Sequence, residues 1–140
     1  MPYVRLLLIE DREDDAILIA HALRRDGLSP HCDRIGTLEA LRAAMRDPQA
    51  FDVILCDSRG PKLELESILP MLRAAWPVTP ILIVSGRQEF EFLDVIARGD
   101  VAGYLSKDRL CDLSAMIAFL KSGPSRDSAP ADWVDRAHLR

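Results

Sequence analysis

The chain has 140 residues, of which 49% are hydrophobic and 29% charged, and its formal net charge is −4. This composition is typical of one globular domain, and the acidic balance with scattered basic residues argues against a direct nucleic-acid partner. No apolar run approaches the roughly 20 residues of a transmembrane helix, and the first apolar segment is too short for a signal peptide, so we expect a cytoplasmic protein without membrane contact.

Short apolar runs alternate with segments of helical periodicity. The expected strands are 4–9, 31–35, 51–56, 80–84 and 103–105, and the expected helices are 14–26, 38–46, 64–76, 88–98 and 110–121. Gly27, Pro77 and Gly99 indicate helix ends. The second strand is weak and suits a sheet edge, whereas the others predict burial on both faces. Alternating strands and helices predict an α/β fold with a doubly wound, five-stranded parallel sheet.

Other segments carry weaker signals. In the first expected helix, an apolar stripe predicted to face the sheet consists of Ala16, Ile17, Ala20 and Leu23. The three cysteines show no CxxC spacing and indicate neither a zinc site nor a disulfide framework. Cys56 ends an apolar run and is expected to be a buried thiol. We expect a domain over 1–122 and a flexible tail or linker over 123–140, either in a stand-alone protein or in a piece of a longer one.

Polar side chains follow four of the expected strands at the point where each strand ends. They are Glu10, Asp11, Asp57, Ser85, Ser106 and Lys107, with Gly86 following Ser85. Each alone is typical of a helix cap, a turn or a solvated side chain. Because the carboxyl ends of parallel strands meet at one edge of a sheet, we expect these residues to converge there as a site.

The converging residue types suit phosphoryl chemistry. Three neighbouring carboxylates raise one another's pKa unless a cation is present, and Mg²⁺ suits a site of carboxylates, waters and a phosphoryl oxygen. Asp57 would be the nucleophile, because a carboxylate can form an acyl phosphate. Lys107 would pair with one phosphoryl oxygen, and Ser85 would donate a hydrogen bond to another.

Over roughly residues 3–121 the sequence resembles the receiver domain of bacterial two-component response regulators. The matching segments are LLLIED at 6–11, DVILCD at 52–57 with Pro61 four places on, ILIVSG at 81–86 and GYLSK at 103–107. The resemblance implies a flavodoxin-like receiver fold with strand order 2-1-3-4-5 flanked by five helices. It also implies a phosphoprotein of a signal-transducing phosphorelay, which is not an enzyme beyond catalysing its own phosphorylation and dephosphorylation.

The same resemblance implies a role for each site residue. Asp57 would accept the phosphoryl group from a phosphohistidine of a sensor histidine kinase or phosphotransfer protein. Mg²⁺ would be bound directly by Asp11, Asp57 and the backbone carbonyl of Arg59, with Glu10 acting through water. The cation would therefore be the one cofactor.

The resemblance also implies a route for the signal. Ser85 and Tyr104 would be the switch pair, with the hydroxyl moving toward the phosphoryl group and the aromatic ring turning inward. Phe90 and Phe92 lie two apart and cannot share a helical face, so we expect at least one to pack inside. Downstream protein partners, including a second copy in a homodimer, would bind at the fourth helix, fifth strand and fifth helix.

The sequence departs from the family pattern at three places. Lys107 is followed by Asp108 instead of proline, so we expect a trans peptide bond there, with Asp108 capping the last helix. Leu65 replaces the glycine usual eight places after the phosphoacceptor. Arg12 and Arg59 flank the acidic residues, and we expect one of them to pair with Asp11 or Asp57 when metal is absent.

Three alternative functions fit parts of this pattern. A haloacid-dehalogenase-like phosphatase needs a second aspartate two residues after the nucleophile, where the chain has Arg59. A flavodoxin-like FMN carrier needs a hydroxyl-rich phosphate loop, where Glu10 and Asp11 would repel the phosphate. A receiver-like interaction module that no longer needs phosphorylation stays open because of Leu65 and Asp108.

Overall fold

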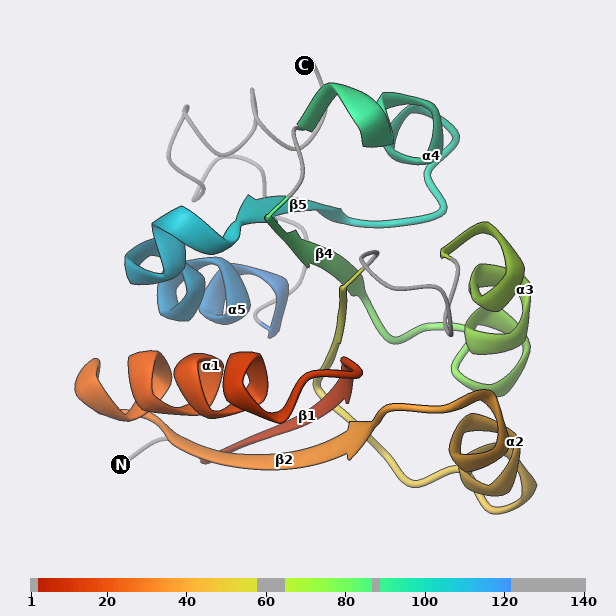
Figure 1. The fold of residues 1–140 in the computed structure, drawn as a ribbon, viewed down its shortest axis with the longest axis horizontal. Coiled ribbons are helices and arrows are strands. Elements are labelled where there is room, and N and C mark those ends of the chain that lie inside the picture. Colours follow the sequence, from red (N-terminus) through yellow and green to blue (C-terminus); the bar gives the residue numbers. More distant parts are fainter. Residues whose placement is uncertain (1–2, 58–64, 87–88, 122–140) are drawn as a thin grey trace.

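A five-stranded parallel sheet lies at the centre of the molecule, with helices on both faces (Figure 1). The computed structural model describes residues 3–57, 65–86 and 89–121. The strands are β1 (Tyr3–Ile9), β2 (Ser29–Ile35), β3 (Val53–Cys56), β4 (Ile81–Ser85) and β5 (Gly103–Ser106). Their order in the sheet is β2-β1-β3-β4-β5, which confirms the predicted fold class and places β2 at an edge.

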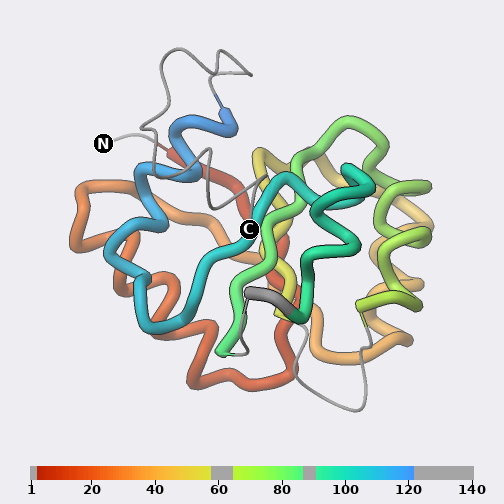
Figure 2. The backbone as a smooth tube through the Cα atoms, turned by 90° about the horizontal axis from the view of Figure 1, so that it is seen from above, coloured from red at the N-terminus to blue at the C-terminus, as the bar shows by residue number. Residues whose placement is uncertain are grey.

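Two layers of helices enclose the sheet. The α-helices are α1 (Glu13–Arg25), α2 (Leu38–Arg46), α3 (Leu65–Ala75), α4 (Leu93–Ala97) and α5 (Leu113–Lys121). Helices α1 and α5 cover one face, and α2, α3 and α4 cover the other, as Figure 2 shows from a direction turned by 90°. The helices expected at 88–98 and 110–121 are both divided, because the 3-10 helices η1 (Glu89–Phe92) and η2 (Lys107–Asp112) precede α4 and α5.

The strands bury apolar side chains on both faces of the sheet. Side chains of alternating residues contact opposite helical layers: Leu7, Ile9, Ile54 and Ile83 pack with α2, α3 and α4, and Leu6, Leu8, Leu55 and Val84 pack with α1 and α5. This alternation follows from the two-residue repeat of a strand. Each fully buried Leu or Ile side chain contributes about 1.5–3 kcal/mol, so the two layers fix the sheet rigidly beneath its carboxyl edge.

The buried face of α1 differs from the predicted stripe. Ile17 is 58% exposed, whereas Ile19 is 3% exposed and packs on the sheet. At 100° per residue, Ile19 lies about 40° from Leu23 around the helix and Ile17 about 120° away. The prediction for Ile17 was therefore wrong, because Leu23 sets the direction of the buried face.

Helix ends follow the predicted signals. Gly27 and Gly99, just after α1 and α4, have φ of 88° and 78°, a left-handed conformation that favours glycine. Beyond α3, the Arg73 guanidinium ties the following turn to the segment before β5. Its acceptors are the carbonyl oxygens of Trp76, Pro77, Thr79 and Asp100, at 3.1 to 3.2 Å.

Several predictions fall outside the described ranges. They concern Arg59, Pro61 and the tail at 123–140. Leu65, by contrast, is the first residue of α3 and is buried. Within the described ranges, no helix has both the length and the apolar character needed to cross a membrane.

Candidate functional site

Glu10 and Asp57 lie side by side at the carboxyl edge of the sheet. The backbone N–H of Asp57 donates to the carbonyl of Ile9 at 2.9 Å, and that of Glu10 donates to Ile35 at 3.0 Å, so both residues extend the strand pairing by one step. Glu10 is 2% exposed and Asp57 is 6% exposed. The sheet therefore holds two carboxylates in a buried position, where charge is costly without a partner.

The backbone and side chain of Glu10 are fixed from three directions. Arg34 of β2 donates from Nη1 to the Glu10 carbonyl at 3.1 Å. The Glu10 carboxylate accepts the backbone N–H of Arg12 at Oε2, at 3.2 Å. Gly36 lies against this turn, and a Cβ there would be 3.4 Å from the Glu10 carbonyl oxygen and 3.5 Å from Asp11 Cα. The close approach of Gly36 leaves the acidic turn little freedom to move.

Three carboxylates have the spacing of metal ligands. One oxygen from each of Glu10, Asp11 and Asp57 lies within 4.8 Å of the other two. Carboxylate oxygens are the ligands that Mg²⁺ prefers, and the donor set therefore fits a hard divalent cation. Arg59, whose carbonyl the resemblance adds to this set, is not among the described residues.

Lys107 joins the acidic residues from the end of β5. Its Nζ donates to Glu10 Oε1 at 2.9 Å, to Asp57 Oδ2 at 3.0 Å and to Asp15 Oδ2 at 2.5 Å. Sequence reasoning missed Asp15, which lies in the first turn of α1 with Glu13 and Asp14. Acidic residues are common in a first helical turn, because they interact favourably with the helix dipole, so the sequence gives no signal that singles out Asp15.

The electrostatics of the site reflect an excess of negative charge. Burial and the hydrogen bond with Asp57 raise the pKa of Glu10 from 4.5 to about 7, although Lys107 opposes the shift. For Lys107, burial lowers the pKa, but hydrogen bonds with Asp15, Glu10 and Asp57 outweigh it and raise the pKa above its ordinary value. The ammonium therefore stays charged, and a further cation would relieve the repulsion among the carboxylates.

The remaining predicted residues lie at the same edge. Ser85 ends β4 and is fully buried, and Gly86 follows it on the surface. Ser85 pairs in register with Ser106 of β5. Tyr104 is 7% exposed, and its ring already lies inward, stacked on Phe92 with the centroids 5.5 Å apart. Phe92 thus packs inside as predicted.

The turn after Lys107 differs from the prediction in one respect. The described residues contain no cis peptide bond, so the bond between Lys107 and Asp108 is trans, as predicted. Asp108 was expected to cap the last helix, and this was wrong. Ser106 is the N-cap of η2, because the chain turns into η2 directly after β5. Its hydroxyl oxygen accepts the backbone N–H of Asp108 at 3.1 Å.

The expected pairing of Arg12 is not observed. In the described part of the chain, its side chain makes no ion pair with Asp11 or Asp57, and Lys107 takes the position beside Asp57. The Arg12 side chain is exposed, and the contact of this residue with the Glu10 carboxylate is through its backbone N–H. The same expectation for Arg59 falls outside the described residues.

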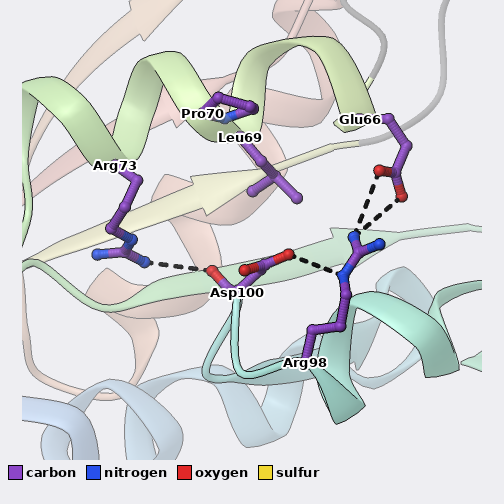
Figure 3. Close-up of a pocket in the computed structure, with 6 residues that line it drawn as sticks. All are labelled: Glu66, Leu69, Pro70, Arg73, Arg98 and Asp100. Atoms are coloured by element: carbon purple, nitrogen blue, oxygen red, sulfur yellow. Dashed lines mark hydrogen bonds and ion pairs between the residues drawn. The ribbon is translucent and has the colours of Figure 1, made fainter.

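A separate pocket of about 310 Å³ lies between α3 and the turn after α4 (Figure 3). Its polar groups bind one another: Arg98 pairs with Asp100 at 2.9 Å and with Glu66 at 3.3 Å, and Arg73 donates to the Asp100 carbonyl at 3.2 Å. These pairs connect α3 to the segment before β5. In the described part of the chain, the charged side chains that line this pocket are thus engaged with other protein groups.

Comparison with known proteins identifies the fold. No protein-family model matches the sequence. The chain is 25% identical over 91 residues to the putative response regulator NtrX-like protein of Rickettsia bellii, a match that covers 65% of this chain and 19% of that protein. The chain thus matches about a fifth of the length of this curated relative.

Solved structures agree with this match. A response regulator receiver domain protein from Clostridium thermocellum has a TM-score of 0.70 at 23% identity, covering 85% of this chain and 94% of that one. The response regulator TrrA of Thermotoga maritima, in complex with Mg²⁺ and BeF, has a TM-score of 0.67 at 15% identity. The match covers 86% of this chain and 99% of that one. An adenylate cyclase structure from Rhodopirellula baltica has a TM-score of 0.71 at 21% identity. The match covers 86% of this chain and 88% of that one.

These neighbours are mostly response regulator receiver domains, and the chain has their fold. Five parallel strands in the order 2-1-3-4-5, with helices on both faces, are the flavodoxin-like arrangement that these domains share. The fold predicted from the sequence resemblance is confirmed.

Proposed function

We propose that the chain is a phosphoacceptor receiver domain in which Asp57 accepts a phosphoryl group. The observation that carries the proposal is the contact of Asp57 with Lys107 inside a cluster of carboxylates with metal-ligand spacing. The Asp57 carboxylate supplies the nucleophile and the Lys107 ammonium supplies the positive charge that phosphoryl transfer requires. The phosphoryl donor would be a phosphohistidine of a sensor kinase or phosphotransfer protein.

In the transfer, an Asp57 carboxylate oxygen forms a bond to phosphorus while the bond from phosphorus to the donor imidazole nitrogen breaks. The nitrogen leaves with the bonding electron pair and takes up one proton. Lys107 pairs with a phosphoryl oxygen and offsets the charge that the phosphoryl group brings. Ser85, at the end of the neighbouring strand, donates its hydroxyl to another oxygen.

Asp11 and Asp57 would hold Mg²⁺ directly, with the Arg59 carbonyl as a further ligand and Glu10 acting through water. When bound, the cation offsets negative charge on the transferring group. The support on the protein side is the close spacing of the Glu10, Asp11 and Asp57 carboxylate oxygens. Burial first, and then Asp57, raise the pKa of Glu10 to about 7.

The signal would leave the site through Ser85 and Tyr104 to a surface formed by α4, β5 and α5. A downstream protein or a second copy of the chain would bind there, and the protein would act in the cytoplasm, where its donor is. Its chemistry would be restricted to its own phosphorylation and dephosphorylation. Tyr104 lies against Phe92 of η1, which directly precedes α4. A change in the position of the Tyr104 ring would therefore displace Phe92 and the start of α4.

Intact mass spectrometry after incubation with Mg²⁺ and acetyl phosphate tests the proposal. The wild type should gain one phosphoryl group, and Asp57→Asn should gain none. Asp94→Asn, which removes an exposed carboxylate of α4, is the matched control and should be phosphorylated like the wild type. An unmodified wild type, or equal modification of Asp57→Asn, would contradict the assignment and favour an interaction module that no longer needs phosphorylation.

A further inference from the structure

Lys107 has a partner whose role the proposed chemistry does not yet include. Among the described residues its Nζ forms three ion pairs, and the pair with Asp15 Oδ2, at 2.5 Å, is the shortest. We propose that Asp15 is a positioning residue that holds the Lys107 ammonium over Asp57 while the phosphoryl group is transferred. This inference rests on the proposed phosphoacceptor function of Asp57.

Asp15 acts on the lysine side of the site. The cluster with metal-ligand spacing consists of Glu10, Asp11 and Asp57. The partners of Lys107 are Glu10, Asp15 and Asp57. Glu10 and Asp57 therefore belong to both groups, whereas Asp15, among the residues that the structure describes, belongs only to the partners of Lys107. A change at Asp15 should reach the phosphoryl group through Lys107.

The need for such an anchor follows from the chemistry of the ammonium. Lysine has three N–H donors on a flexible four-carbon stem, and the three carboxylates engage all of the donors. During the transfer Lys107 exchanges its contact with the Asp57 oxygen for one with a phosphoryl oxygen, so one of its three contacts changes while the phosphoryl group arrives. Glu10 must also face the cation site. Asp15 has no second task and keeps Lys107 in place.

The local structure makes Asp15 suited to this task. It lies in the first turn of α1, four residues after Asp11, and its side chain is only 18% exposed. Lys107 is only 15% exposed, so the pair is shielded from much of the solvent that weakens surface ion pairs. The anchoring helix is itself fixed on the sheet by Ile19 and Leu23.

The rate of phosphoryl acceptance from acetyl phosphate, followed by intact mass, tests this role. Asp15→Asn should be phosphorylated about tenfold more slowly than Asp14→Asn, the range typical for removing a residue that orients a functional group. Asp14 is the matched control, because it is exposed, carries the same charge on the same turn and is not a partner of Lys107. Mg²⁺ affinity, measured by calorimetry, should be alike in the two variants.

A double-mutant cycle shows whether the effect passes through Lys107. In a Lys107→Gln background, Asp15→Asn should cause no further loss, because the ammonium that it positions is absent. Asp15→Glu keeps the carboxylate on a longer arm and should give a rate between those of the wild type and Asp15→Asn. Thermal melting in EDTA checks that all variants share one fold.

The outcomes separate the two proposals. An unmodified wild type overturns both. With a phosphorylated wild type, equal or faster phosphorylation of Asp15→Asn relative to Asp14→Asn overturns the positioning role alone. The positioning role is also overturned if Asp15→Asn lowers the rate of phosphorylation by the same factor in the wild-type and Lys107→Gln backgrounds. Asp15 would then act without Lys107.

Discussion

Replacing Glu10 with glutamine tests the electrostatics of the site without any phosphodonor. The Glu10 carboxyl has a pKa of about 7 in the folded protein, raised from 4.5 chiefly by burial. A group whose pKa is higher in the folded than in the unfolded state binds more protons when folded. Its contribution to stability is therefore lost as the pH rises between these two values.

The magnitude follows from the two pKa values. The difference between 4.5 and about 7 corresponds to about 3 kcal/mol of free energy of unfolding, lost as the pH rises from about 4.5 to about 7. Glutamine has nearly the same shape and cannot ionise, so Glu10→Gln should lack this part of the pH dependence. The variant should consequently gain stability relative to the wild type as the pH rises.

Urea unfolding at pH 5, 6, 7 and 8 in EDTA, followed by circular dichroism, measures this difference. Glu39→Gln removes one exposed carboxyl of α2 and controls for the change of net charge. We expect the wild-type and Glu10→Gln profiles to diverge by about 2.5 kcal/mol from pH 5 to pH 8, because part of the loss has already occurred by pH 5. Parallel profiles would refute the reasoning, because they would show that ionising Glu10 costs the fold nothing.

Three further substitutions test the elements that hold the site, each by urea unfolding at constant pH. Arg73→Lys should lower the free energy of unfolding by about 2 kcal/mol, because a compact ammonium cannot reach the carbonyls that the guanidinium fork binds; an unchanged midpoint would contradict this. Thr37→Ala should cost about 1 kcal/mol, since Thr37 Oγ1 accepts the Ala40 N–H at the start of α2; Thr37→Ser should cost far less. Gly27→Ala should cost about 1–2 kcal/mol because of its φ of 88°, and a neutral result would show that the turn relaxes.

The fold could be predicted from sequence because its main signal is local. Buried parallel strands are short apolar runs, and the helices between them leave little choice of topology. The division of the last helix could not be predicted this way. It depends on the Ser106 hydroxyl capping the Asp108 N–H and on the non-helical conformation of Arg109, with φ of −124° and ψ of 38°, and neither feature has a periodic signature.

The site shows the same boundary between local and long-range information. Glu10, Asp57 and Lys107 were predictable because each follows a strand, and strand ends meet at one edge. Asp15 was not, because its partner Lys107 is 92 residues away and an acidic residue in a first helical turn has an ordinary explanation. The prediction for Ile17 was wrong for a related reason, because contacts with the sheet determine which face of α1 is buried.

The cysteines lie in three different environments, with a practical consequence. Cys56 is fully buried beside Asp57, and burial raises the pKa of its thiol and that of Cys32. Cys111 is exposed in η2, four residues after Lys107. Because the thiolate is the reactive species, a maleimide dye should attach at Cys111 first. The native chain thus provides a labelling site four residues after the lysine that we propose pairs with the phosphoryl group, with no engineered cysteine.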